Sequence, residues 1–208
     1  MELYICDIRN LSDLKGINKL DKERRSRLYR YRRNEDRMRS LCAGLMLLHV
    51  LGVENAAAIT ASDTEKPVID GGPWFNLSHS GNYVILAVDG SEVGADIEQV
   101  ETYPKKVAEK VFMPSEQKWL LKQGNDEAFY RLWTGKEAVM KALGLGFRLP
   151  PESFEINPDS QEACCVCGRS WYLDWNHIDN NVICTASESP EKPDRIIMLT
   201  GKELLDVC

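Results

Sequence analysis

Two short segments of the chain carry carboxylates at spacings that suit a divalent cation. Asp96 and Glu98 stand two residues apart in an expected strand, so both side chains project from the same face. Glu137 and Lys141 stand four residues apart in an expected helix, again on one face. Clustered carboxylates favour Mg²⁺ or Mn²⁺, and a lysine beside them suits a phosphate.

Each segment alone also has an ordinary structural explanation. Two acids on an edge strand can simply be solvated, and Glu137 before Lys141 is the favourable order for a surface ion pair. Trp133, however, lies on the same stripe of the helix. Because a large ring is normally buried, its presence argues against a merely solvated face.

The segment 75–80, Phe-Asn-Leu-Ser-His-Ser, brings a hydroxyl and an imidazole to the end of an expected strand. Neighbouring strand residues point to opposite faces, so Ser78 and His79 cannot form the nucleophile–base pair of a hydrolase. A serine, a histidine and backbone amides in a turn suit an anionic oxygen instead. Upstream, Lys66 precedes Pro67 in a loop, which on its own indicates only a solvated lysine.

The composition is that of an ordinary globular protein. Hydrophobic residues make up 43% and charged residues 28%, and no apolar run is long enough to span a bilayer. We therefore expect no membrane partner, and the N-terminus has no secretory signal. Seven cysteines without framework spacing indicate reduced thiols and a cytoplasmic location. The cluster of Cys164, Cys165 and Cys167 lacks the further ligands that a zinc site requires.

Positive charge is concentrated in one segment of an acidic chain. Residues 21–39 hold nine basic and four acidic residues, although the net charge of the chain is −6. Such a patch indicates a local anionic ligand rather than nucleic acid, which normally requires a basic domain. An arginine-rich, solvated helix face explains the same pattern equally well.

Periodicity and turn residues predict an α+β fold. The expected helices lie at 21–31, 34–51, 105–112 and 114–123, and from Asp126, as N-cap, to Gly144 or Gly146. The expected strands lie at 1–7, 74–78, 83–88, 92–98, 154–156, 170–176, 182–186 and 196–199, with 74–98 as an antiparallel meander. We expect two pseudo-symmetric half-domains, 1–102 and 103–208, each with helices packed on a small, mainly antiparallel sheet.

Three motifs in this order resemble those of the 4′-phosphopantetheinyl transferases, specifically the larger, two-lobed class that activates peptide synthetases. They are Phe-Asn-Leu-Ser-His-Ser at 75–80, Gly-x-Asp-x-Glu at 94–98 and Trp-x-x-Lys-Glu-Ala-x-x-Lys at 133–141. The resemblance implies two lobes with coenzyme A, the substrate, bound between them. It implies that a monomer transfers the phosphopantetheine arm to a serine of an apo carrier protein and releases 3′,5′-ADP.

The resemblance also implies a role for each matching residue. Asp96, Glu98 and Glu137 would hold Mg²⁺ at the pyrophosphate, which Lys141 would contact as well. Asp96, Glu137 and Lys141 are therefore the expected catalytic residues, with Glu137 as the base for the carrier serine. The expected coenzyme A ligands are Arg24, Arg27, Arg39, Ser40, Lys66, Ser78, His79 and Lys141.

Some of these expectations are narrower. His79, Arg24 and Arg27 would face the 3′-phosphate, and Lys66 would lie near the adenine and its ribose. Relatives carry lysine where this chain has Arg24 and Arg27, so the charge is kept while the hydrogen-bonding geometry changes.

Two other functions share part of the pattern. A non-catalytic module that binds coenzyme A or a carrier protein would not need all of Asp96, Glu98, Glu137 and Lys141. A metal-dependent nucleotide pyrophosphatase would use the same acids without a carrier. For a transferase, we expect the carrier to dock near the second-half helices at 104–123.

Overall fold

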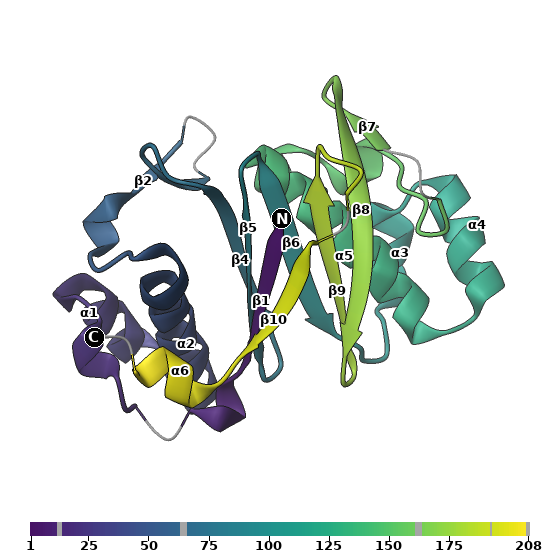
Figure 1. Ribbon diagram of the computed structural model, residues 1–208. Coiled ribbons are helices and arrows are strands. Elements are labelled where there is room, and N and C mark those ends of the chain that lie inside the picture. The colour runs from purple at the N-terminus through teal and green to yellow at the C-terminus, as the bar shows by residue number, and fades with distance from the viewer. Residues whose placement is uncertain (12–13, 63–65, 161–163, 192, 207–208) are drawn as a thin grey trace.

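In the computed structural model, two lobes each contain an 18-residue helix packed on a four-stranded sheet. The two lobes lie side by side (Figure 1). The structure describes residues 1–11, 14–62, 66–160, 164–191 and 193–206. The expected α+β class is confirmed. Among the described residues, no helix is long and apolar enough to cross a membrane.

The first sheet joins both ends of the chain. Its strands, in order across the sheet, are β10 (Arg195–Leu199), β1 (Glu2–Asp7), β5 (Tyr83–Asp89) and β4 (Trp74–Ser80). β10 runs parallel to β1, and the other pairs are antiparallel. The remaining elements of this lobe are the helices α1 (Lys22–Arg30), α2 (Asn34–Leu51) and α6 (Gly201–Leu205) and the short strand pair β2 (Ile59–Ala61) and β3 (Pro67–Ile69).

The second sheet is antiparallel throughout. Its strands, in order, are β6 (Val93–Gln99), β9 (Asn181–Ser187), β8 (Arg169–Ile178) and β7 (Cys164–Val166). The helices of this lobe are α3 (Lys105–Val111), α4 (Pro114–Gln123) and α5 (Asp126–Leu143). Because α5 packs on β6 and β9, it lies directly against the strand that carries the paired acids.

The two lobes repeat one plan, in which an opening strand pairs with the second strand of a later hairpin. β1 pairs with β5 of the β4–β5 hairpin, and β6 pairs with β9 of the β8–β9 hairpin. The expected meander is therefore wrong in its third strand, because the turn at Asp89-Gly90 leads β6 out of the first sheet. The change of sheet lies at 90–92, so a division into 1–102 and 103–208 would leave β6 in the wrong half. β10 and α6 also return from the second half to the first lobe.

Local signals account for most element boundaries. Asp21 caps α1 by accepting hydrogen bonds from the amides of Glu23 and Arg24, and α2 ends at Gly52 in the left-handed conformation. The N-cap of α5 is Asn125 rather than the expected Asp126, because the Asn125 side chain accepts the hydrogen bond from the third helical amide. The strand expected at 154–156 does not form; that short apolar segment is buried by packing without ladder partners.

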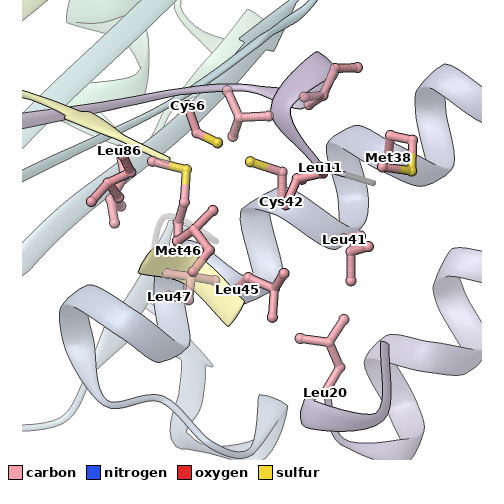
Figure 2. Close-up of a cluster of buried hydrophobic side chains, with 14 of the residues drawn as sticks. Cys6, Leu11, Leu20, Met38, Leu41, Cys42, Leu45, Met46, Leu47 and Leu86 are labelled. Atoms are coloured by element: carbon pink, nitrogen blue, oxygen red, sulfur yellow. The ribbon is translucent and has the colours of Figure 1, made fainter. Parts of the chain in front are cut away.

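Apolar side chains of α2 fill the core of the first lobe. Figure 2 shows Leu45, Met46 and Leu47 of α2 in the same cluster as Leu86 from β5. Cys42 of α2 and Cys6 of β1 point toward one another there (Figure 2). A hydrogen bond to Cys6, together with burial, raises the pKa of the Cys42 thiol. All six cysteines of the described part are free thiols, while Cys208 lies outside the described residues.

A separate apolar cluster joins the two sheets. Leu3 and Ile85 of the first sheet pack with Ala95 and Ile97 of β6, and all four are buried. Since strand side chains alternate, this packing turns Asp96 and Glu98 toward the opposite face of β6. The face of β6 that carries the acids is therefore turned toward α5 and β4.

Candidate active site between the lobes

β4 and β6 lie side by side where the lobes meet, and side chains connect them in place of a backbone ladder. Asn76 Oδ1 accepts from the Ala95 amide at 2.9 Å, and Ser78 Oγ donates to Asp96 Oδ1 at 2.8 Å. Ser80 Oγ donates to Glu98 Oε2 at 2.9 Å and accepts from the Gln99 amide at 3.0 Å. Alternate polar residues of β4 thus hold both acids of β6 at the lobe boundary.

A glycine allows α5 to approach β6 closely. A Cβ atom at Gly94 would lie 1.9 Å from the Ala138 carbonyl oxygen and 2.5 Å from the Ala142 amide nitrogen. Any larger residue would push the helix away from the strand. The close approach brings Lys141 Nζ to 2.5 Å from Asp96 Oδ1 and 3.0 Å from Ser78 Oγ.

The acids and the motif helix line one cavity of about 440 Å³. Trp133, Glu137 and Lys141 face it from α5, and Asp96 and Glu98 face it from β6. The stripe of helix residues and the pair of strand residues predicted from spacing therefore meet at one place. We call this space the acid cavity.

The acid cavity holds more negative charge than its neighbours neutralise. Asp96 Oδ2 is buried and has no hydrogen-bond partner in the described part of the chain. Burial, and then the charge of Asp96, raises the pKa of Glu98. Burial also raises the pKa of Glu137, against the smaller opposing attraction of Lys141. A cation bound beside these carboxylates would oppose both shifts, because it favours the ionised form.

The donor set fits a hard divalent cation, since it offers three carboxylates and one orphaned buried oxygen. As they are placed, however, no three acidic, histidine or cysteine side chains of the described residues stand close enough to hold one ion. Asp96 is instead paired with Lys141.

A larger cavity of about 600 Å³ adjoins the acid cavity in the first lobe. It contains most of the expected coenzyme A ligands: Arg24, Arg27, Arg39, Ser40, His79 and Lys141. His79 and Lys141 line both cavities, so the two spaces adjoin at these residues. We call the larger space the basic cavity.

The arginines of the basic cavity are held to different degrees. Arg39 donates to the Gly81 carbonyl at 2.7 Å and pairs with Asp36. Arg24 Nε lies 3.4 Å from Asp21, whereas Arg27 is largely exposed beside Glu23. Burial, aided by the charge of Arg39, lowers the pKa of His79. An anion entering this cavity therefore meets the well-held charge of Arg39 and the more exposed charge of Arg27.

Comparisons with known proteins agree with the motifs. The model of the 4′-phosphopantetheinyl transferase superfamily matches residues 92–187. The chain is 31% identical over 204 residues to 4′-phosphopantetheinyl transferase Sfp of Bacillus subtilis (strain 168), and the match covers 88% of each chain. This chain belongs to the 4′-phosphopantetheinyl transferase family. Its activity is the transfer of phosphopantetheine from coenzyme A to a carrier protein.

Two further matches differ in extent. 4′-Phosphopantetheinyl transferase gsp of Aneurinibacillus migulanus is 32% identical over 152 residues, which is 69% of this chain and 64% of that protein. The crystal structure of Thermotoga maritima holo-[acyl-carrier-protein] synthase aligns with 46% of this chain and 61% of its own, at 25% identity and a TM-score of 0.40. The residues that match the superfamily model begin just before β6 and end with β9, so they contain all four strands of the second sheet.

Two of the expected coenzyme A ligands lie outside the basic cavity of this transferase. Ser78 lines the acid cavity and hydrogen bonds to Asp96. Lys66 is only 4% exposed, and its Nζ donates to the carbonyls of Val93 and Ala142 at 2.8 and 2.9 Å. The neighbouring Pro67 does line the basic cavity. The Lys66 ammonium therefore lies at the α5–β6 junction.

The motif lysine Lys136 had no expected role, and the structure gives it one. Its Nζ is fully buried 2.8 Å from Glu116 Oε1 and donates to the carbonyls of Pro151 and Phe154 at 2.8 and 2.6 Å. Glu116 also accepts from the Ile156 amide at 2.8 Å. This network ties α5, which carries Glu137 and Lys141, to α4 and the segment after it.

Asn76 and Ser80 were also missed. Their signal was present, because polar residues at 76, 78 and 80 recur with the two-residue period of a strand. A strand face that is polar at every second position inside the protein needs polar partners. Only the packing of β4 beside β6, a strand of the other sheet, identifies the element that supplies them.

Proposed function

We propose that the acid and basic cavities together form the transfer site, with Mg²⁺ held by Asp96, Glu98 and Glu137. The observation that carries this proposal is the meeting of the three carboxylates and Lys141 in one cavity, which adjoins a cavity rich in arginine. Coenzyme A carries a 3′-phosphate and a pyrophosphate, so a basic pocket beside a metal-binding pocket matches its charge distribution.

The basic cavity would receive the nucleotide end of coenzyme A. Arg24, Arg27 and His79 would meet the 3′-phosphate, and Arg39 and Ser40 line the same cavity. His79 has a lowered pKa in this structure, and a phosphate beside it would favour its protonated form. The pyrophosphate would then lie at Lys141, where the two cavities meet.

The acid cavity would hold the cation. The orphaned Asp96 Oδ2 and the raised pKa values of Glu98 and Glu137 support a site for Mg²⁺, or for Mn²⁺, which takes similar oxygen ligands. When bound there, the ion would neutralise the pyrophosphate and stabilise the leaving group. For this arrangement, Lys141 would exchange its contact with Asp96 for one with the phosphate.

The side chains of the protein would divide the remaining work. Glu137 would accept the proton of the carrier serine, whose oxygen forms a bond to the β-phosphorus of coenzyme A. The bond from that phosphorus to the bridging oxygen breaks, and 3′,5′-ADP leaves. Lys141 would stabilise the negative charge that develops on this leaving group.

The carrier protein would dock beside α3 and α4. Val107 of α3 and Leu121 of α4 are exposed hydrophobic residues, and Leu121 is 76% exposed. Apolar residues on an exposed helix surface support a partner-binding role. We further propose that the enzyme acts as a monomer, because one chain lines both cavities, and that it acts in the cytoplasm, which suits its free cysteines.

Mass spectrometry of apo carrier proteins tests this function. After incubation with coenzyme A and Mg²⁺, we expect a carrier to gain one phosphopantetheine arm while 3′,5′-ADP appears in equal amount. Release of 3′,5′-ADP without a carrier would indicate a pyrophosphatase instead. Binding of coenzyme A with no release in either case would indicate a non-catalytic module.

A further inference from the structure

We propose that Lys66 is a positioning residue, which fixes the spacing of α5 and β6 and thereby sets Lys141 against Asp96. The proposal rests on the role of Lys141 at the pyrophosphate that is proposed above. It replaces the contact with adenine and ribose that the family resemblance implied for Lys66.

Lys66 joins the strand and the helix at the point where they approach most closely. Its Nζ donates to the carbonyl of Val93 on β6 and to the carbonyl of Ala142 on α5. Val93 precedes Gly94, the residue whose missing side chain permits the close approach. Ala142 directly follows Lys141. One ammonium group therefore bridges the two backbones that carry the reacting side chains.

The geometry also suits the end of a helix. Carbonyls in the last turn have no partner within the helix, and a cation there interacts favourably with the helix dipole. The carbonyls of Met140 and Lys141 accept from the amides of Leu145 and Gly144. Lys66 supplies the donor for Ala142, the next carbonyl of that turn.

The position is costly for a lysine, so stability alone does not explain it. Lys136, equally buried, is paired with Glu116, whereas the hydrogen bonds described for Lys66 Nζ go to two neutral carbonyls beside the Trp74 ring. Burial lowers the pKa of Lys66 to about 8. A hydrophobic side chain of the same length would avoid this desolvation. Retaining an amine here favours a function that depends on the bridge.

Lys66→Met tests the bridge, because methionine is of similar length and has no donor. We expect kcat at saturating apo carrier to fall about tenfold, because small displacements of reacting groups are costly. We expect KM for coenzyme A to stay within about twofold, since the side chain does not touch the basic cavity. A residue that binds adenine or ribose would show the opposite, a raised KM with an unchanged kcat.

A double-mutant cycle with Lys141→Met separates positioning from general damage. If Lys66 acts through Lys141, then Lys66→Met lowers kcat by less than about twofold once Lys141 is absent. Equal factors in both backgrounds would overturn the proposal. An unchanged kcat in Lys141→Met would reject both this proposal and the role of Lys141. An unchanged kcat in Lys66→Met alone would reject only the proposal for Lys66.

Thermal melting curves show whether each variant is folded at the assay temperature. The matched control is Lys202→Met, at an exposed lysine of α6. If Lys66→Met does not fold, Lys66→Gln replaces it, because its neutral amide keeps two donors on a shorter side chain. We then expect a partial loss of kcat, again at constant KM for coenzyme A. If Lys66→Gln and Lys66→Ala both fold and both keep full activity, the proposal is overturned.

Discussion

Lys136 and Lys141 lie on the same helix, and their surroundings differ in a way that separates structure from chemistry. Lys136 is completely buried, with a carboxylate and two carbonyls around its ammonium group. Lys141 is 28% exposed, and its partner Asp96 keeps one buried oxygen without a hydrogen bond. The first cluster is satisfied within the protein, and the second is not.

The difference indicates two separate roles for α5, one in folding and one in turnover. A satisfied buried network fixes one arrangement of the chain, because breaking it leaves a charge without a partner. An unsatisfied cluster costs stability in the free protein and gains its missing partners when a ligand binds. We therefore expect changes around Lys136 to affect folding and changes around Lys141 to affect turnover.

The largest effect is expected at the acid cavity. Asp96→Asn removes one negative charge from the proposed metal site without changing the size of the side chain, and we expect kcat/KM for transfer to fall about 10³-fold, as for the loss of a central electrostatic group. The measurement is phosphopantetheine transfer at fixed Mg²⁺. Glu152→Gln, at an exposed glutamate outside both cavities, is the control and should keep full activity. Comparable rates for the two variants would remove Asp96 from the mechanism.

Changes in the cluster around Lys136 should lower the free energy of unfolding. Lys136→Met leaves Glu116 buried without its cation, and we expect a loss of about 3–5 kcal/mol in the free energy of unfolding. The double variant Lys136→Met with Glu116→Leu should recover much of that loss, because no charge remains buried. Urea denaturation measures both values. If the double variant were no more stable than the single one, the loss would not come from the unpaired carboxylate.

A smaller change at the α5–β6 junction should link the two clusters. Gly94→Ala places a Cβ atom where the Ala138 carbonyl now lies, so the helix must move outward. We expect about 1–3 kcal/mol of destabilisation and a loss of kcat of about tenfold or more. Gly90→Ala, in an open turn, is the matched control, because nothing lies within 4 Å of a Cβ there. A fully active Gly94→Ala would show that the close approach is not needed.

The smallest expected effect is a gain in stability. Burial raises the folded-state pKa of Glu137 above its ordinary value of 4.5, so the folded protein binds this proton more tightly than the unfolded chain. The ionised side chain therefore destabilises the free protein at neutral pH, and the cost disappears as the pH falls through that raised pKa toward 4.5. We expect Glu137→Gln to melt a few degrees higher at pH 7 and to lose this advantage near pH 4.

The same variant should lose transfer activity, because the proposed base is gone. Melting curves across the pH range, measured without divalent ions, supply the stability comparison. A melting temperature for Glu137→Gln below that of the natural protein at pH 7 would contradict the pKa argument. Normal turnover with intact binding of Mg²⁺ and coenzyme A would show that Glu137 is not the base.

Sequence patterns predicted what depends on neighbours in the chain. The period of α5 put Trp133, Glu137 and Lys141 on one face, and strand alternation put Asp96 beside Glu98. Local capping signals located α1 and α2 to within one residue.

Contacts between distant segments were not predictable in the same way. A tight turn after β5 is compatible with a hairpin, and only the pairing of β6 with β9 shows that the chain leaves the sheet. Lys66 was expected at the nucleotide, but the carbonyls that hold it lie on elements 27 and 76 residues further along the chain. Lys136 likewise depends on a glutamate from another helix.

Titration with Mn²⁺ in the presence of coenzyme A tests the central claim most directly, because unbound Mn²⁺ is counted by its electron paramagnetic resonance signal. The account predicts one tightly bound ion per chain and a large loss of affinity in each of Asp96→Asn, Glu98→Gln and Glu137→Gln. Undiminished binding in all three variants, or no bound ion in the natural protein, would contradict it.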